Sequence, residues 1–182
     1  MLKDAILFKN EIQEQYELIK YDDRFKFLFA NSYRNEFFDL RSGKEDCIEQ
    51  VSVNKDNLLV GYMLATVEKD WNVVVNLRIL NFREKGNIIF SYDLYEFLQN
   101  LFIVEGFSKI QFKCIVGNPI MKMYIKYIEK FNGNIVGTLH NAVRLSDGLM
   151  YDYILFEVFK EDFDRITKEK RNKELDYIIK FE

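Results

Sequence analysis

The alternation of apolar and polar residues predicts a three-strand meander in the middle of the chain. Residues 48–53, 58–67 and 73–80 form runs that are rich in β-branched and aliphatic side chains. Short polar stretches separate these runs, as tight turns between antiparallel strands would. Gly61 lies inside the middle run, where a glycine indicates either a bulge or a close backbone approach.

Helical spacing replaces this alternation on both sides of the meander. After Phe82, apolar residues recur three and four positions apart as far as Gly106, which predicts a helix that stops there. Residues 2–40 are also expected to be helical, with Asp22 and Asp23 as caps of a second helix. The apolar face of that helix is expected to pack on the sheet rather than to line a substrate wall, and it comprises Phe25, Leu28, Phe29, Tyr33, Phe37 and Leu40.

A further strand and helix follow in the second half. Residues 109–116 form a β-like run that leads into Asn118 and Pro119. Asparagine is a favoured N-cap and proline is tolerated in the first helical position, so a helix is expected to start here. It is expected to end near Gly133 in a left-handed cap.

The chain is expected to close with a hairpin and a charged helix. Residues 134–145 and 149–159 are β-like, and Ser146-Asp147-Gly148 between them has the composition of a hairpin turn. From Glu161 the sequence is charged and favours a helix. This order of elements predicts an α+β fold, with a mainly antiparallel sheet flanked by helices.

Composition supports one domain over residues 1–182. The chain is 48% hydrophobic, which is ample for a core, and it has only 8 Gly and 1 Pro, which argues against a long linker. Within this domain we expect three parts: a divergent helical segment at 1–45, a core at 46–161 and a charged C-terminal tail at 162–182.

Charge and cysteine usage exclude several function classes. Lys and Arg total 26 against 29 acidic residues, so no general attraction to nucleic acid or anionic lipid is expected. No run is long enough to span a membrane, and we expect a cytoplasmic protein. Cys47, Cys114 and His140 lack the spacing of a metal site. Cys114 and His140 also form a formal nucleophile pair, but burial in β-like runs is the simpler interpretation.

Candidate chemistry gathers where the meander meets the following helix, at Arg83-Glu84-Lys85-Gly86-Asn87-Ile88. A helix N-terminus offers unpaired backbone N–H groups and a partial positive charge, so it binds phosphate. Arg83 and Lys85 add positive charge, and Gly86 lacks a side chain that would keep a phosphate from the backbone. This turn is therefore predicted to bind a pyrophosphate.

These residues resemble the GNAT superfamily of acetyltransferases. Leu59-Val60-Gly61-Tyr62 is similar to the third strand of that family, and the turn at residues 81–88 is similar to its fourth strand and phosphate loop. The family pattern is Arg or Gln, two residues, Gly, one residue, then Gly or Ala. Arg83 and Gly86 match it, and Ile88 departs from it. The closing hairpin resembles the RimJ/RimL-like branch, whose members acetylate protein N-termini, polyamines and other amines.

The resemblance implies where a cofactor would bind. Pantetheine would lie along the end of the fourth strand and the pyrophosphate in the following turn, with an asparagine from the next strand-to-helix junction. The implied residues are Ile79, Leu80, Asn81, Arg83, Glu84, Lys85, Gly86, Asn87, Ile88 and Asn118.

Catalytic residues are less sharply indicated. In the family a helix tyrosine returns a proton to the leaving thiolate; Tyr127 or Tyr124 would take this role, and Tyr127 fits the surrounding pattern better. Glu68 is the candidate general base, although a solvated turn carboxylate is the simpler interpretation.

The implied function is an acetyl-CoA-dependent N-acetyltransferase in which a primary amine attacks the thioester directly. The acceptor would be a small-molecule amine or a protein N-terminus, and a homodimer is left open. The alternative is a catalytically inactive GNAT-fold module that binds CoA or another protein.

Overall fold

The computed structural model describes residues 1–28, 38–41, 43–83 and 87–179. Part of the predicted phosphate turn (Glu84, Lys85 and Gly86) and part of the predicted apolar helix face (Phe29, Tyr33 and Phe37) lie outside these ranges. Within the described ranges, no helix is long and apolar enough to cross a membrane.

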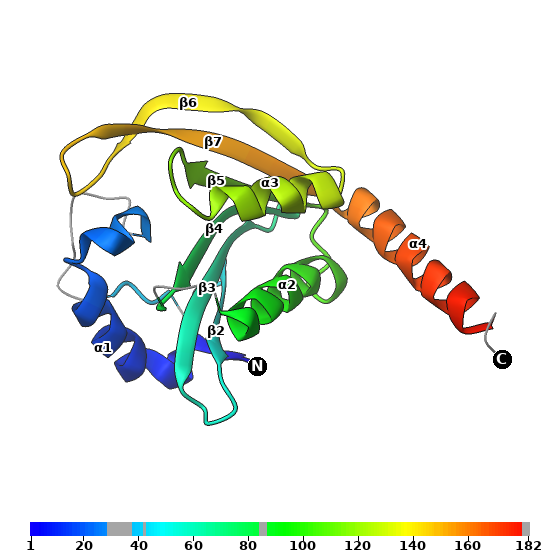
Figure 1. Cartoon of the computed structure of the whole chain (residues 1–182), viewed down its shortest axis with the longest axis horizontal. Coiled ribbons are helices and arrows are strands. Elements are labelled where there is room, and N and C mark those ends of the chain that lie inside the picture. Colours follow the sequence, from blue (N-terminus) through cyan, green and yellow to red (C-terminus); the bar gives the residue numbers. More distant parts are fainter. Residues whose placement is uncertain (29–37, 42, 84–86, 180–182) are drawn as a thin grey trace.

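One sheet organises the described chain, with the strand order β1-β2-β3-β4-β5-β7-β6 (Figure 1). Neighbouring strands are antiparallel except β4 and β5, which are parallel. This confirms the predicted α+β fold with a mainly antiparallel sheet. The strands are β1 (Leu2–Asp4), β2 (Cys47–Val53), β3 (Leu59–Glu68), β4 (Val73–Asn81), β5 (Lys109–Ile115), β6 (Asn134–Arg144) and β7 (Met150–Phe159).

Helices cover both faces of this sheet. Figure 1 shows α2 and α3 side by side over one face, and α4 leading away from the sheet at the C-terminal end. Short 3₁₀ helices precede and follow α1. The bounds are η1 (Ala5–Phe8), α1 (Lys9–Ile19), η2 (Asp23–Leu28), α2 (Ile88–Ile103), α3 (Met121–Lys130) and α4 (Lys160–Ile179).

Strand β3 is the centre of the core because both of its faces are buried. Met63 and Ala65 pack in the cluster that includes residues of α2 and α3, whereas Tyr62 and Leu64 pack in the cluster that includes residues of α1. Successive side chains of a strand point to opposite faces, so α1 lies across the sheet from α2 and α3. Gly61 makes the close approach that was predicted, because an added Cβ would lie 2.7 Å from the Leu80 carbonyl oxygen.

The first 40 residues differ from the prediction of a wholly helical segment. Leu2–Asp4 forms a strand that pairs with β2. This strand is too short for its alternation to be recognised in the sequence. Asp22 precedes only the short η2, which begins at Asp23, and Leu40 lies in non-helical chain. Leu40 and Phe25 nevertheless pack against the core on the α1 side, as expected of an apolar face that covers a sheet.

The ends of α3 also differ in detail from the prediction. The helix starts at Met121, and Asn118 caps the preceding turn by accepting a hydrogen bond from the Ile120 N–H at 3.1 Å. At the other end Asn132, not Gly133, adopts the left-handed conformation, with φ of 51°. Gly133 is needed for another reason, because a Cβ there would lie 2.5 Å from the Glu157 carbonyl oxygen.

Candidate active site

A wedge between β4 and β5 interrupts the sheet. The two strands are paired only at Val73 with Lys109 and Val74 with Ile110. Beyond this point β4 stays paired with β3 as far as Asn81, and β5 stays paired with β7. The edge of β4 that faces β5 therefore presents backbone N–H and C=O groups without a strand partner. The wedge opens toward the C-terminal ends of both strands.

A β-bulge in β4 accounts for this divergence. Thr66 of β3 pairs with Asn76 and Val67 pairs with Val74, so Val75 is an extra residue in β4. A bulge bends the strand that carries it and increases its twist. It therefore turns β4 away from β5 immediately after their last paired residues.

The N-terminus of α2 lies beyond the open end of the wedge, one loop after β4. The Asn87 side chain caps it, accepting a hydrogen bond from the Ile89 N–H at 2.9 Å. Ile88, the first helical residue, is 86% exposed. The helix dipole therefore places partial positive charge at an accessible position, which suits an anionic ligand.

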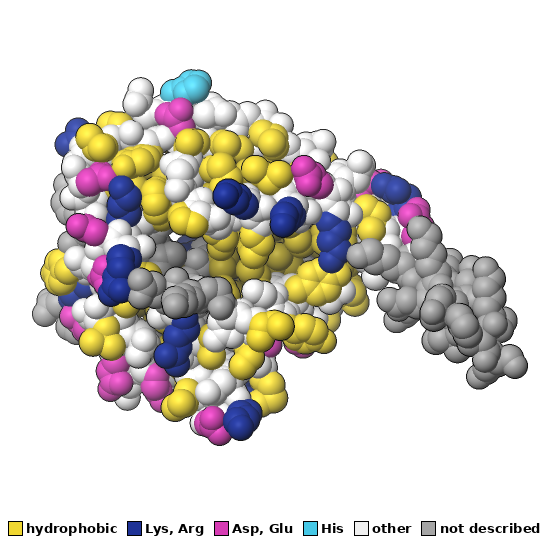
Figure 2. Space-filling view, in the orientation of Figure 1, with side chains coloured by type: hydrophobic (Ala, Val, Ile, Leu, Met, Phe, Trp, Pro, Cys, Tyr) yellow, Lys and Arg dark blue, Asp and Glu magenta, His cyan; other side chains and the backbone are white. Residues whose placement is uncertain are grey.

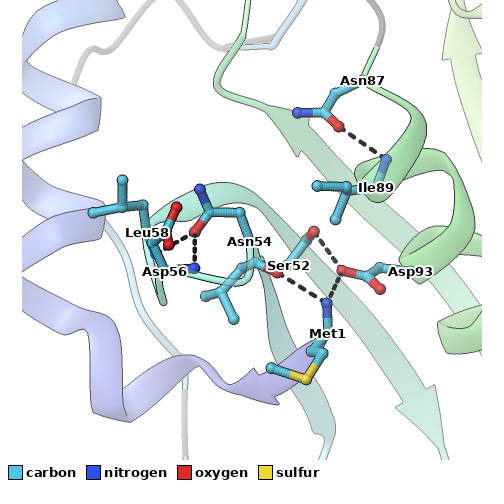
Figure 3. A network of polar contacts seen from close by, with 9 residues as sticks. Met1, Ser52, Asn54, Asp56, Leu58, Asn87, Ile89 and Asp93 are labelled. Atoms are coloured by element: carbon cyan, nitrogen blue, oxygen red, sulfur yellow. Dashed lines mark hydrogen bonds and ion pairs between the residues drawn. The ribbon is translucent and has the colours of Figure 1, made fainter.

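A buried polar network fixes this helix against the sheet (Figure 3). Asp93 of α2 is 3% exposed, and its carboxylate accepts hydrogen bonds from the Ser52 hydroxyl at 2.6 Å and the Met1 ammonium at 2.7 Å. Met1 also donates to the Val53 carbonyl oxygen at 2.9 Å. A buried carboxylate needs such partners, and this set connects α2 with β2 and the start of the chain.

The surface is hollowed between α2 and α3, with hydrophobic side chains on its floor and basic side chains along α3 (Figure 2). The basic residues of α3 are Lys122, Lys126 and Lys130, which are exposed and share one helix face through their spacing of four. The Lys130 ammonium lies 4.3 Å from the ring centroid of Tyr95 on α2. This row was not among the predicted site residues, although its spacing is visible in the sequence.

The two candidate tyrosines occupy different environments. Tyr124 is 8% exposed and its ring lies 4.9 Å from that of Phe112 on β5, so it faces the sheet. Tyr127 packs on Phe131, with ring centroids 4.8 Å apart. Burial raises the pKa of both hydroxyls. The Tyr127 hydroxyl is buried without a hydrogen-bond partner among the described residues, whereas most buried polar groups have one.

Most of the predicted cofactor residues that the structure describes lie toward the open end of the wedge. Ile79 and Leu80 are buried in opposite faces of β4. The Asn81 side chain accepts a hydrogen bond from the Arg83 N–H at 3.0 Å. Asn118 follows β5 on the other side of the wedge.

Glu68, the candidate base, is not brought together with these residues. It is exposed and pairs with Val73, at the closed end of the wedge. Its role stays a prediction. Cys114 and His140, the formal nucleophile pair, lie in different environments. Cys114 is buried, whereas the side chain of His140 is 77% exposed and bonded to Asp152 at 2.9 Å.

Comparison with known proteins matches this architecture to solved acetyltransferase structures. A GCN5-related N-acetyltransferase from Brucella melitensis superposes with a TM-score of 0.66 at 15% identity, covering 92% of this chain and 78% of that one. The spermidine/spermine N-acetyltransferase SpeG from Vibrio cholerae gives a TM-score of 0.58 at 14% identity, covering 68% of this chain and 71% of that one. A third structure, provisionally assigned as an acetyltransferase, gives 0.53 at 20% identity, and the match spans 62% of its length.

Sequence comparison adds no closer assignment. No family model matches the chain, and no curated protein matches it. The likeness therefore resides in the three-dimensional arrangement rather than in the sequence. The chain has the fold of the GNAT N-acetyltransferases.

Proposed function

We propose that this protein is an acetyl-CoA-dependent N-acetyltransferase that transfers the acetyl group to a primary amine. The observation that carries the proposal is the wedge, because β4 and β5 are paired only at Val73 with Lys109 and Val74 with Ile110. The free edge of β4 offers hydrogen-bonding groups to an extended amide-containing chain such as pantetheine. The exposed N-terminus of α2 then suits the pyrophosphate.

The residues present fit acetyl-CoA in three further respects. Lys122, Lys126 and Lys130 offer positive charge along the hollow between α2 and α3, where phosphates would gain from it. The apolar floor of that hollow suits the uncharged part of the cofactor. The Tyr127 hydroxyl, buried without a partner among the described residues, could hydrogen-bond a ligand group.

Acetyl-CoA supplies an activated thioester, so the protein needs only to position the acceptor and to stabilise the developing oxyanion. A backbone N–H near Leu80 on the free edge of β4 would donate a hydrogen bond to the carbonyl oxygen. The neutral amine would attack the carbonyl carbon, the C–S bond would break as the amide forms, the amine nitrogen would release a proton to water, and the departing thiolate would take up a proton. We propose Tyr127, with Tyr124 as the alternative, as the donor of that proton. No covalent enzyme intermediate is required.

Ile88→Asp tests the cofactor site and separates binding from folding. Aspartate in the first turn of a helix stabilises the helix dipole, so stability should be unchanged or slightly higher. The same carboxylate would face the phosphates, and acetyl-CoA affinity in calorimetry should fall about tenfold or more by charge repulsion. Ile88→Ala, which restores a residue of the family pattern, is the matched control and should bind at least as tightly as wild type.

Two results would contradict the proposal. The first is a folded wild-type protein with no measurable acetyl-CoA binding. The second is binding without thiol release across a panel of amines, which would instead support a CoA-binding module without catalysis.

A further inference from the structure

The face of the wedge that lies away from α2 and α3 carries two basic side chains, one from each strand. On β5, Phe112 and Cys114 belong to the core cluster beneath α2 and α3. Lys113 lies between them in sequence and therefore points to the opposite face. On β4, Leu77 and Ile79 belong to that same cluster, so Arg78 also points to the opposite face.

Arg78 and Lys113 also lie at the same level on the two sides of the wedge. Val74 pairs with Ile110, and Val75 is the extra residue of the bulge. Counting onward from that pair, the third residue after Val75 is Arg78 and the third after Ile110 is Lys113. The two cations therefore flank the wedge where its strands have separated.

Neither cation is paired with a carboxylate within the described part of the chain. Arg78 is half-buried and makes no ion pair or hydrogen bond there, and Lys113 is exposed. The Lys113 ammonium lies 4.8 Å from the ring centroid of Tyr153 on β7, which holds it over an aromatic surface without neutralising it.

Two carboxylates of this face, Glu49 and Asp147, have hydrogen-bond partners of their own. Glu49 is 8% exposed and accepts hydrogen bonds from the Tyr62 hydroxyl and from the Arg41 N–H at 3.0 Å. Asp147, in the hairpin turn, is bonded to Lys26 at 2.8 Å and to the Tyr151 hydroxyl at 2.6 Å. Within the described part of the chain, neither of these carboxylates forms an ion pair with Arg78 or Lys113.

We propose that the acceptor carries an anionic group beside its amine, and that Arg78 and Lys113 bind this group while the amine enters the wedge. The inference rests on the proposed acetyl transfer, in which acetyl-CoA occupies the α2 and α3 side. A guanidinium and an ammonium together suit a carboxylate or a phosphate. They would repel a polycation such as the spermidine named for SpeG.

Matched acceptors test the proposal in a thiol-release assay. One pair is a dipeptide with a free C-terminal carboxylate and the same dipeptide as its C-terminal amide. A second pair is an amino sugar with and without a phosphate, and spermidine completes the panel. In at least one of the two pairs, kcat/KM for the anionic acceptor should be about tenfold or more above that for its neutral partner, because charge-assisted hydrogen bonds would hold the anion. The pair that shows the preference identifies the anion as carboxylate or phosphate.

Arg78→Gln and Lys113→Gln should remove this preference by raising KM for the anionic acceptor, with a smaller change in kcat. Arg78→Lys should retain part of it. Lys55→Gln, in the exposed turn before β3, is the control for a lost surface charge and should change nothing. Calorimetry with acetyl-CoA should give wild-type affinity for all these variants, because the substitutions lie on the opposite face.

The inference is overturned if the protein binds acetyl-CoA but acetylates neutral amides or spermidine at least as well as the anionic acceptors. Turnover of no anionic acceptor by a protein that binds acetyl-CoA also overturns it. Failure of acetyl-CoA binding would instead remove the proposed function and this inference together, so the calorimetric result tells the two failures apart.

Discussion

The wedge divides the sheet into a first half, β1 to β4, and a second half, β5, β7 and β6, and the two halves differ in burial. Strand β3, in the first half, is buried along almost its whole length, with α1 on one face and α2 on the other. Strand β6, at the outer edge of the second half, is exposed along almost its whole length. The halves share only two pairs of sheet residues, so side chains rather than backbone must hold them together. A sheet joined in this way can stay open at one end without unfolding.

The largest predicted effect concerns Phe112, which belongs to the core cluster that also contains Leu77 and Ile79 of β4. Phe112 of β5 is 3% exposed, and its ring lies 5.2 Å from Phe156 and 4.9 Å from Tyr124. Phe112→Ala should lower the free energy of unfolding by about 3–5 kcal/mol, because it leaves a cavity in the shared core. Urea unfolding followed by circular dichroism measures this.

Val136→Ala is the control from the outer strand, because Val136 is 53% exposed. Its cost should stay within about 0.5 kcal/mol, as for most surface substitutions. Similar losses for the two variants would contradict a contribution of Phe112 to this shared core.

An intermediate effect is expected from glycine-to-alanine substitutions, because Gly61 in the first half is closely packed whereas Gly137 in the second half is not. A Cβ at Gly61 of β3 would overlap the Phe90 ring of α2 and lie 2.7 Å from the Leu80 carbonyl oxygen. Gly61→Ala should cost about 1–3 kcal/mol through overpacking. Gly137 of β6 has no atom within 4 Å of an added Cβ. Gly137→Ala should therefore be neutral or stabilise by up to about 1 kcal/mol, since it restricts the unfolded chain.

Thermal or urea unfolding compares these two alanine variants directly. Phe90→Leu should recover part of the loss in the Gly61→Ala background, because it removes the ring but not the clash with the carbonyl oxygen. Full additivity of the two substitutions would contradict a direct contact between Gly61 and Phe90.

The sequence predicts the elements of both halves better than the relation between them. Period-two runs, helical spacing and the Asp147-Gly148 turn locate the meander, the helices and the closing hairpin, because each depends on local residues. The wedge depends on the extra residue Val75, which becomes a bulge only through the pairing of β3 with β4. The spacing of apolar residues along one strand cannot reveal how that strand pairs with its neighbour.

The candidate site was predicted in part for the same reason. The residues of the phosphate turn stand together in the sequence and match a family pattern, so they could be named. The placement of Arg78 and Lys113 on opposite sides of the wedge could not be predicted, because it follows from a parallel register between strands 35 residues apart. The lysine row on α3 could have been predicted from helical periodicity alone.

The smallest predicted effect concerns a second connection between the halves, at the molecular surface. Lys26 of η2 binds Asp147 of the closing hairpin at 2.8 Å, and Tyr151 donates to the same carboxylate. The hydrogen bond from Lys26, then that from Tyr151, lower the pKa of Asp147 from 3.8 to about 2. The hydrogen bond with Asp147 also raises the pKa of Lys26 to about 12.

A carboxylate with a lowered pKa in the folded state contributes stability above its unfolded pKa and loses it as pH falls toward the folded pKa. The stability difference between wild type and Asp147→Asn should therefore be constant above pH 3.8 and shrink as pH falls to about 2. The difference should also decrease with added salt, because this pair is near solvent. Urea midpoints of both proteins across this pH range test the sign. A difference that stays level down to about pH 2 would show that the Lys26–Asp147 ion pair contributes nothing through charge, leaving the shared core around Phe112 as the principal connection between the halves.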